Sequence, residues 1–250
     1  GLLFDVTTSL QLIELSRPNH PLLQFILRAA PGTYQHSLQV ANLAETAAGV
    51  IGASPMLTRV GALYHDCGKA VRPEFFVENQ LDGDNIHTRL DPAASARAII
   101  AHVTDGLDLA RKHRLPTAIR NFIPEHHGTL LTRFQYSRAL EQAGGDATGV
   151  DASAFRYPGP RPRSKETALL MLADACESTV RALRPASLEE IDRLVGRLIE
   201  ERISAGQFDD TDLTLNDLRA IRQSFVGTLK GAFHARLTYP DDDKLQAPGQ

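Results

Sequence analysis

The segment TYQHSLQVANLAETAAGVIG, residues Thr33 to Gly52, decides how this chain is expected to fold. Residues of the inward-facing type recur in it at steps of four and three: His36, Val40, Leu43, Ala47 and Val50. This spacing puts them on one face of an α-helix. The segment therefore predicts a helix with a buried stripe, and it places His36 on that stripe.

Signals for the start of a helix recur outside this segment. Ser54-Pro55 and Asp91-Pro92 each join an N-cap residue to a first-turn proline. Ser187 opens the capping box Ser-Leu-Glu-Glu, and Lys165 begins another helical pattern. No segment shows the alternating pattern of a strand, so we predict an all-α protein.

Pro116 predicts one further helix, which ends at Gly128 and buries Ile119, Phe122, Ile123 and His126 on one face. The helix that begins at Ser54-Pro55 is expected to end at Gly68. The last long helix is marked by apolar residues between 215 and 229.

Two stretches without periodicity, residues 72–90 and 144–164, predict loops. We expect a single domain over residues 1–250, with a core at about residues 20–185 and flanking helices at about 187–236. The fold expected is a helical bundle.

Composition limits the class of protein. The hydrophobic share of 42% and the charged share of 23% are ordinary for a water-exposed globular protein, and the net charge of −3 provides no general attraction for DNA or RNA. Cys67 and Cys176 lack paired spacing and are expected in the core. No apolar stretch reaches the roughly 18–20 residues that span a bilayer, and the abrupt start at Gly1 suggests a piece of a longer chain.

Seven side chains of the kinds that bind metals come from five separate segments, and most have apolar neighbours: His36, His65, Asp66, His102, His126, His127 and Asp174. Burying such groups is costly unless something satisfies them. One ion accepts at most about six ligands, so seven donors without cysteine predict two divalent metal ions that share a ligand. Paired metals activate water for attack on phosphorus, which makes a phosphodiesterase the first hypothesis.

The two adjacent pairs constrain the geometry. Neighbouring side chains on a helix diverge by about 100°, so His65 and Asp66 reach a metal together only near a helix end. The same holds for His126 and His127. Asp66 is the candidate bridge, because its two oxygens can face different ions. A set of His and Asp ligands favours iron or manganese, with zinc as an alternative.

Lys69, one turn after this pair, is a candidate for binding a phosphate oxygen or stabilising the leaving group, alongside Asp66 as a catalytic residue. A lysine that is merely solvated is the alternative. His87 is an open candidate for the same site, because it lies in the loop before Asp91.

The run YHDCGK, residues 64–69, resembles the signature of the HD-domain phosphohydrolase superfamily, with His36 upstream and Asp174 downstream. More specifically, the chain resembles the HD domain of the seven-transmembrane HD-receptor family, the PgpH-type cyclic-di-AMP phosphodiesterases. The resemblance extends from about residue 20 to about Pro240 and rests on six blocks: PGTYQHS (31–37), FFVENQ (75–80), HVTDG (102–106), HHGT (126–129), FRYPGP (155–160) and MLAD (171–174).

The resemblance implies an HD-domain helical bundle with a binuclear site. One ion would be held by His36, His65, Asp66 and Asp174, and the other by Asp66, His102, His126 and His127. It also implies hydrolysis of cyclic di-AMP to pApA by a metal-activated hydroxide. The domain would lie at the cytoplasmic face of the cell membrane, joined to a membrane-embedded region of the same chain. A homodimer is a candidate assembly.

Purine bases stack on aromatic rings and guanidinium planes, so Arg133, Arg156 and Tyr157 are candidate substrate contacts together with Lys69. The FRYPGP block is equally well explained as a rigid turn against the bundle. Alternatives for the whole domain are hydrolysis of cyclic di-GMP or a nucleoside phosphate, a non-catalytic nucleotide sensor, or purely structural metals. No nucleic-acid polymer is expected as a partner.

Overall fold

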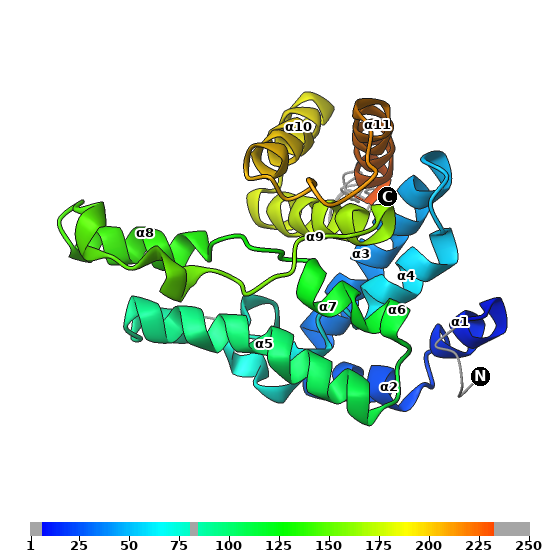
Figure 1. The fold of residues 1–250 in the computed structure, drawn as a ribbon, viewed down its shortest axis with the longest axis horizontal. Helices are drawn as coiled ribbons and strands as arrows, with labels where there is room; N and C mark the ends of the chain where they lie inside the picture. Colours follow the sequence, from blue (N-terminus) through cyan, green and yellow to red (C-terminus); the bar gives the residue numbers. More distant parts are fainter. Residues whose placement is uncertain (1–6, 81–84, 233–250) are drawn as a thin grey trace, which may run out of the picture.

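The structure is a computed structural model that describes residues 7–80 and 85–232. Within these ranges all regular elements are helical, apart from one isolated bridge between Leu131 and Arg156. The all-α prediction is confirmed (Figure 1). The α-helices are α1 (Ser9–Leu15), α2 (Pro21–Ala29), α3 (Pro31–Val50), α4 (Pro55–Tyr64), α5 (Pro92–Lys112), α6 (Thr117–Arg120), α7 (Phe122–Glu125), α8 (Arg133–Gln142), α9 (Lys165–Leu183), α10 (Leu188–Ser204) and α11 (Leu215–Ala232).

Short 3-10 helices lie between several of these elements: η1 (Cys67–Val71), η2 (Pro73–Phe75), η3 (Val77–Asn79), η4 (Ile86–Thr88), η5 (Ala147–Gly149) and η6 (Ala152–Phe155). Three of them fall within residues 72–90, where only a loop was predicted. The sequence there has no helical repeat because a turn of this kind is too short to show one.

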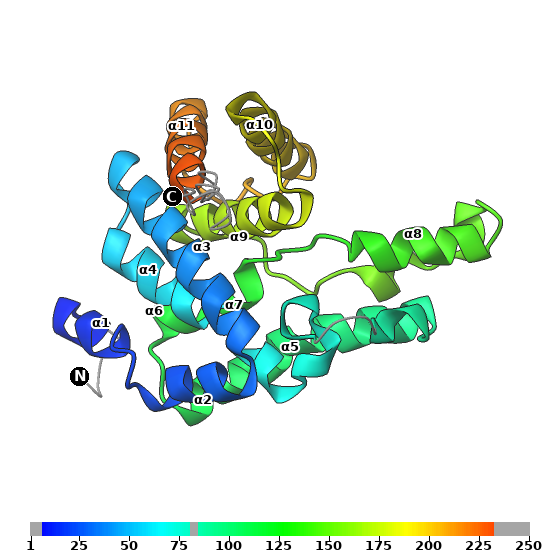
Figure 2. The same ribbon diagram turned by 180° about the vertical axis from the view of Figure 1, so that it is seen from behind.

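Helices α3, α4 and α9 pack together in the middle of the molecule, and α10 and α11 form a layer over α9 and α3 (Figure 1). Helices α5 and α8 lie side by side and extend away from this centre (Figure 2). Residues 233–236 of the predicted flanking helices lie outside the described residues. The division into core and flanking helices remains a prediction.

The stripe on α3 is buried as predicted at His36, Val40, Leu43 and Ala47. Val50 is the exception, because its side chain is 58% exposed. Helix α3 ends at this residue and the chain turns, so Ile51 takes the inward position instead.

The predicted helix after Pro116 is divided into α6 and α7 at Asn121. Pro124 explains the break, because proline has no N–H to donate to the carbonyl of Arg120, four residues earlier. The four predicted inward residues are nevertheless all buried.

Gly68 does not end α4, which stops at Tyr64. Instead it lies in η1, where a Cβ atom would collide with the carbonyl of His102 on α5. The residue must be glycine because the two backbones are so close. This close approach brings the His65-Asp66 pair beside α5.

Two caps differ in detail from the prediction: Ser54 precedes α4 but makes no side-chain cap hydrogen bond, and Ser187 forms only part of its capping box. The Ser187 hydroxyl accepts from the Glu190 N–H at 3.2 Å, but the Glu190 carboxylate accepts from Ala186 N rather than Ser187 N. Only half of the predicted capping box forms. Asp91 does cap α5, accepting from Ala94 N at 3.1 Å.

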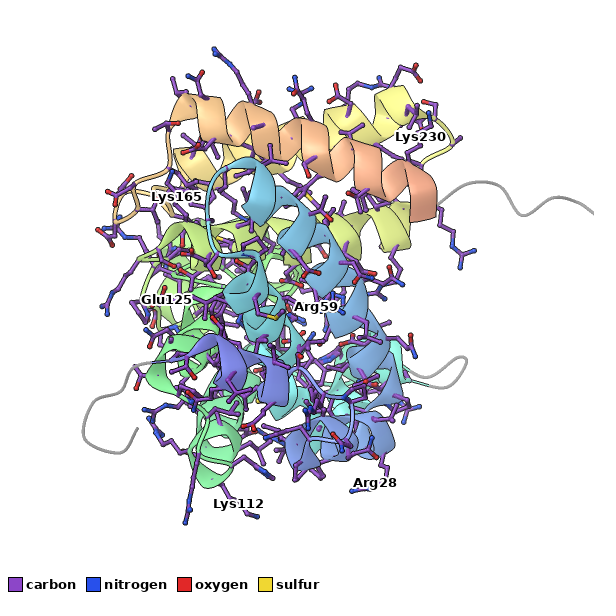
Figure 3. The ribbon with its side chains drawn as sticks, turned by 90° about the vertical axis from the view of Figure 1, so that its right-hand side faces the viewer. Arg28, Arg59, Lys112, Glu125, Lys165 and Lys230 are labelled. Atoms are coloured by element: carbon purple, nitrogen blue, oxygen red, sulfur yellow. The ribbon has the colours of Figure 1, made fainter. Side chains whose placement is uncertain are left out.

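Charged side chains such as Arg28, Lys112 and Lys230 project from the surface, whereas Glu125 is buried (Figure 3). Both cysteines are buried and free, as expected. Among the described helices, none combines the length and the apolar character needed to cross a membrane.

Candidate metal centre

The seven predicted side chains meet in the interior, where they form two groups of four that share Asp66. One, the His36 group, consists of His36, His65, Asp66 and Asp174; the other, the His102 group, consists of Asp66, His102, His126 and His127. Within each group, one potential ligand atom per residue lies within 4.8 Å of those of the other members.

The ligand residues come from helix interiors and from helix ends. His36 lies in α3, His102 in α5 and Asp174 in α9. His65 is the C-cap residue of α4 and His126 is that of α7, so each adjacent pair leaves its helix at the site. The two neighbouring side chains can therefore point to the same place, as the sequence predicted.

Asp66 is 1% exposed, and its two oxygens face different groups. Oδ1 lies 3.4 Å from Nε2 of His102 and 3.5 Å from Nε2 of His126. Oδ2 lies 3.2 Å from Nε2 of His65 and 3.6 Å from Nε2 of His36. Each oxygen of Asp66 therefore faces a different group of potential ligands.

Three histidines are oriented by their own helical turns. Nδ1 of His65, His102 and His126 each lies 2.6 Å from the backbone carbonyl three residues earlier. Such a carbonyl can only accept, so Nδ1 carries the proton and Nε2 presents its lone pair to the centre.

Several of these central atoms have no hydrogen-bond partner. Nε2 of His65 and Oδ1 of Asp66 are buried without one. The Nε2 atoms of His102 and His126 face each other at 3.4 Å, and neither holds a proton to share. Buried acceptors that converge in this way are stabilised by a cation, so the donor set fits divalent metal ions.

His36 is held differently, by two carboxylates of α9. Its Nε2 lies 3.0 Å from Asp174 and its Nδ1 lies 2.5 Å from Glu177. Burial lowers the pKa of His36, but these hydrogen bonds outweigh burial and raise the pKa to about 9. Arg181 donates to Glu177 at 3.1 Å.

Glu177 was missed by the sequence reasoning. Its position three residues after Asp174 puts it on the same face of a helix, and that spacing is the signal that could have revealed it.

The remaining pKa values favour metal binding near neutral pH. Burial lowers the pKa of His102 to about 4 and holds that of His127 well below its usual range. Burial raises the pKa of Asp66, but Lys69 and His65 reverse the effect and hold it low. These three ligands are therefore present as neutral imidazoles and a carboxylate, the forms that coordinate metal.

Lys69 lies at the centre, with Nζ 2.8 Å from Oδ2 of Asp66 and 3.0 Å from Glu78. Burial lowers the pKa of Lys69, but the two carboxylates outweigh burial and raise it, so the ammonium stays charged. Glu78 also accepts from the Thr33 hydroxyl at 3.2 Å. The FFVENQ block thus ties the lysine to the start of α3, a role that the sequence did not reveal.

The other predicted substrate residues lie at different distances from the centre. Tyr157 stacks on His127, with ring centroids 4.1 Å apart. Arg156 donates to the carbonyl of Thr129 at 3.0 Å, two residues after His127. Arg133 is turned to Glu201 of α10, at 2.8 Å, and is not brought to the centre by any described contact.

His87 does not join either group. It is buried and bonds to the carbonyl of Phe75 and the hydroxyl of Ser95, so it holds η4 against η2 and α5. His87 therefore joins these elements and belongs to neither ligand group, so its candidate role at the site is replaced by a structural one.

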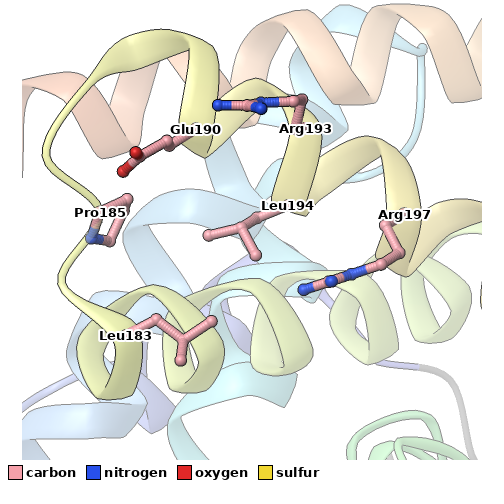
Figure 4. Close-up of a pocket in the computed structure, with 6 residues that line it drawn as sticks. All are labelled: Leu183, Pro185, Glu190, Arg193, Leu194 and Arg197. Carbon is pink, nitrogen blue, oxygen red and sulfur yellow. The ribbon is translucent and has the colours of Figure 1, made fainter.

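Two cavities differ in their position relative to the ligand candidates. One of about 240 Å³ adjoins the centre and is lined in part by His36, Glu78 and Glu177. A larger one of about 380 Å³ lies between α9 and α10 (Figure 4), and none of the seven ligand candidates lines it. Of the seven ligand candidates, His36 lines the smaller cavity, which therefore reaches the centre from the side of the His36 group.

Comparison with known proteins agrees with this geometry. The HD domain family model matches residues 33–179. The cyclic-di-AMP phosphodiesterase PgpH of Bacillus subtilis (strain 168) is 44% identical over 241 residues, which cover 96% of this chain and 33% of that protein. The chain thus spans about a third of the length of the curated relatives it matches.

Solved structures give the same result. The crystal structure of the PgpH HD domain of Listeria monocytogenes has a TM-score of 0.81 at 41% identity, with 86% of this chain and 100% of that chain covered. A structure of that domain in complex with cyclic-di-AMP has a TM-score of 0.82 at the same identity, with 87% and 100% covered. Because the family model spans more than half of the chain and the Listeria domain aligns along its whole length, this chain belongs to the HD domain family and is of the PgpH type.

Proposed function

We propose that this domain is a metal-dependent phosphodiesterase that hydrolyses cyclic di-AMP to pApA. The reaction adds one water across one of the two phosphodiester bonds. A new bond forms between the water oxygen and phosphorus, the bond from phosphorus to one ribose oxygen breaks, and a proton passes to that oxygen. The product is a linear dinucleotide with a terminal phosphate.

The observation that carries the proposal is the shared carboxylate of Asp66, whose two oxygens face the His36 group and the His102 group separately. A structural metal needs one closed set of about four ligands, and a shared carboxylate is not required for that purpose. Two adjoining groups with a common bridge are the arrangement used for phosphoryl chemistry.

We propose that two divalent cations, iron or manganese, are held by these seven residues. When bound, such a pair lowers the pKa of water and offsets the negative charge that develops on the phosphoryl oxygens. Asp66 would contribute to holding both cations. The His and Asp ligands are of the kinds that suit iron and manganese.

Lys69 is the second proposed catalytic residue. Its ammonium has three N–H donors, and Asp66 and Glu78 use two of them. The third is available for a phosphoryl oxygen, where a charged donor in a buried site stabilises the transition state.

The substrate is the least constrained part of the proposal. The PgpH relatives carry cyclic di-AMP in their names, and one solved relative is in complex with it. We propose that Tyr157, already stacked on His127, offers a face to one adenine, and that Arg156 and Arg133 line the approach. Arg133 would have to leave Glu201 to do so.

A substrate panel tests the proposal. The purified domain, loaded with Mn²⁺ or Fe²⁺, is offered cyclic di-AMP, cyclic di-GMP, nucleoside triphosphates and a short RNA, and the products are separated by chromatography. We expect pApA from cyclic di-AMP at the highest kcat/KM. A preference for a nucleoside triphosphate would refute the cyclic-dinucleotide assignment, and binding without turnover would make the domain a sensor.

We further propose that the domain works at the cytoplasmic face of the cell membrane, attached to a membrane-embedded region, and that it pairs as a homodimer. The family resemblance supports the first point, together with the greater length of the relatives. Membrane fractionation of the full-length protein and light scattering of the domain test these two points separately.

A further inference from the structure

The turn that carries two members of the His102 group runs from His126 to Thr129, and it begins where α7 ends. Gly128 has a φ of +51°, a conformation that glycine adopts at little cost. His126 is oriented by its own helical turn, through the carbonyl of Ile123. The residues after it lie beyond the helix. Gly128 N donates to the carbonyl of Glu125 at 3.1 Å, and Arg156 donates to the carbonyl of Thr129 at 3.0 Å. Further contacts come from the C-terminal layer.

Gln207 makes these contacts from the connection between α10 and α11. Its Oε1 accepts from Thr129 N at 3.0 Å, and its Nε2 donates to the Thr129 hydroxyl at 3.0 Å. A second Nε2 hydrogen bond goes to the carbonyl of Ala205, also at 3.0 Å. The side chain is 2% exposed, so both ends of a buried amide are satisfied by this one turn and its own loop.

Packing as well as hydrogen bonding joins Gln207 to the turn. A Cβ atom on Gly128 would collide with Oε1 of Gln207. The glycine is therefore required both for its positive φ and for the space that the amide occupies. Between them these two residues set how closely the turn approaches the C-terminal layer.

The connection that carries Gln207 is anchored on its other side. Arg161, just after the FRYPGP block, donates to the carbonyl of Gly206 at 3.0 Å and pairs with Asp209 at 2.9 Å and Asp210 at 3.0 Å. The amide of Gln207 is thus held by a fixed loop rather than by a free surface segment. It also lies beyond residues 33–179, to which the family model is confined.

We propose that Gln207 is a positioning residue for the His126–His127 ligand pair, so that the α10–α11 layer sets the geometry of the cation position formed by the His102 group. This inference rests on the proposed two-cation function. It gives the C-terminal layer a role at the centre, although none of its side chains contributes a ligand.

The effect is selective for one group. The turn carries two members of the His102 group and none of the His36 group. A less ordered turn is therefore expected to weaken cation binding by the His102 group and to leave cation binding by the His36 group unchanged. Loss of a residue that hydrogen-bonds a metal ligand typically costs about 10–100-fold in metal affinity, and because Gln207 acts through Thr129 we expect the lower end, about tenfold.

The test compares Gln207→Met with wild type and with Gln223→Met. Methionine keeps the length of the side chain and removes both hydrogen-bonding ends. Gln223 is exposed on α11 in the same layer, so its substitution is a matched control. Mn²⁺ binding to the metal-stripped proteins is followed by calorimetry, and the magnetic coupling of the ion pair by electron paramagnetic resonance.

We expect Gln207→Met to bind one of the two Mn²⁺ ions as wild type does and the other about tenfold more weakly, with less signal from a coupled pair. Gln223→Met should match wild type in both steps. If Gln207→Met bound both ions with the affinities of wild type, the inference would be overturned. Equal weakening of both steps would also overturn it, because a general loss of stability does not choose between the groups.

Two further variants guard against a misfolded protein. Gln207→Glu keeps the acceptor for Thr129 N, so its affinity for the more weakly bound Mn²⁺ should lie between those of wild type and Gln207→Met. Thr129→Val removes the hydroxyl partner, and in combination with Gln207→Met it should cost less than the sum of the single changes. Full additivity would contradict a direct coupling between these residues.

Failure of the proposed function is distinguishable in the same experiment. Wild-type protein that binds a single ion would overturn both the two-cation function and the inference. Wild-type protein that binds a coupled pair but leaves cyclic di-AMP intact would overturn only the substrate assignment. In that case, weaker binding of one ion alone by Gln207→Met would still support the inference.

Discussion

The two halves of the centre differ in how far the protein satisfies them without a cation. In the His36 group, one imidazole is bonded to two carboxylates, Asp174 and Glu177, and a positive charge on His36 is compensated there. In the His102 group, three imidazoles surround a single carboxylate, and two Nε2 atoms face each other at 3.4 Å. The His36 group therefore has charged partners within the protein, whereas the His102 group leaves converging acceptors without a hydrogen-bond donor.

This difference shows that the two groups are built from different parts of the fold. The His36 group is prepared by long helices, since His36 and Asp174 lie well inside α3 and α9. The His102 group depends on a turn after α7 and on the contact from Gln207. We therefore expect changes in the two halves to have distinct effects.

The largest effect is expected where the halves meet. Asp66→Ala removes the only residue that both groups share, so it should reduce turnover of cyclic di-AMP to background and lower the metal content from two ions to fewer than one. Elemental analysis and a product assay on one sample measure both. Turnover equal to that of wild type would show that Asp66 does not bridge.

The stability of the metal-stripped protein gives the next comparison. His36→Ala leaves Asp174 and Glu177 buried beside each other without the imidazolium, which should cost about 3–5 kcal/mol. His102→Ala removes one of three crowded imidazoles and should cost at most about 2 kcal/mol. Urea unfolding with chelator present measures both variants. The comparison is wrong if the two costs are equal.

Glu177→Gln sharpens the comparison from the side of the His36 group. The amide keeps the size of the side chain but loses the charge that orients His36 and pairs with Arg181. We expect the affinity for one ion to fall about tenfold, and this ion should be the one that Gln207→Met leaves unchanged. Calorimetric Mn²⁺ titration of both variants and their combination provides the measurement. If the combined variant lost affinity for only one of the two ions, and by the sum of both effects, Glu177 and Gln207 would act on the same cation position.

The smallest effect is expected at the edge of the site. Arg133→Ala should raise KM for cyclic di-AMP about twofold to threefold and leave kcat unchanged, because the guanidinium is mostly exposed and already paired with Glu201. Steady-state kinetics of Arg133→Ala beside Arg138→Ala, on the same helix, measures it. A KM raised more than about tenfold would make Arg133 a principal substrate contact.

Much of this architecture was readable from residue order. The step of four and three in α3 predicted that His36 would be buried, and the adjacent pairs predicted helix ends at His65 and His126. The errors lie where local pattern competes with a neighbouring constraint. Val50 is exposed because its helix stops there, and Pro124 divides a helix whose inward face was otherwise correct.

The sequence by itself determined the helical class and the seven ligand candidates, because helical periodicity and ligand chemistry are local properties of residue type and spacing. Only the tertiary structure decided the supporting contacts. Glu177 meets His36 across 141 positions of sequence, and Gln207 meets Thr129 across 78. Such contacts depend on how whole helices pack: the spacing of Asp174 and Glu177 indicates a shared helix face but does not identify His36 as the partner.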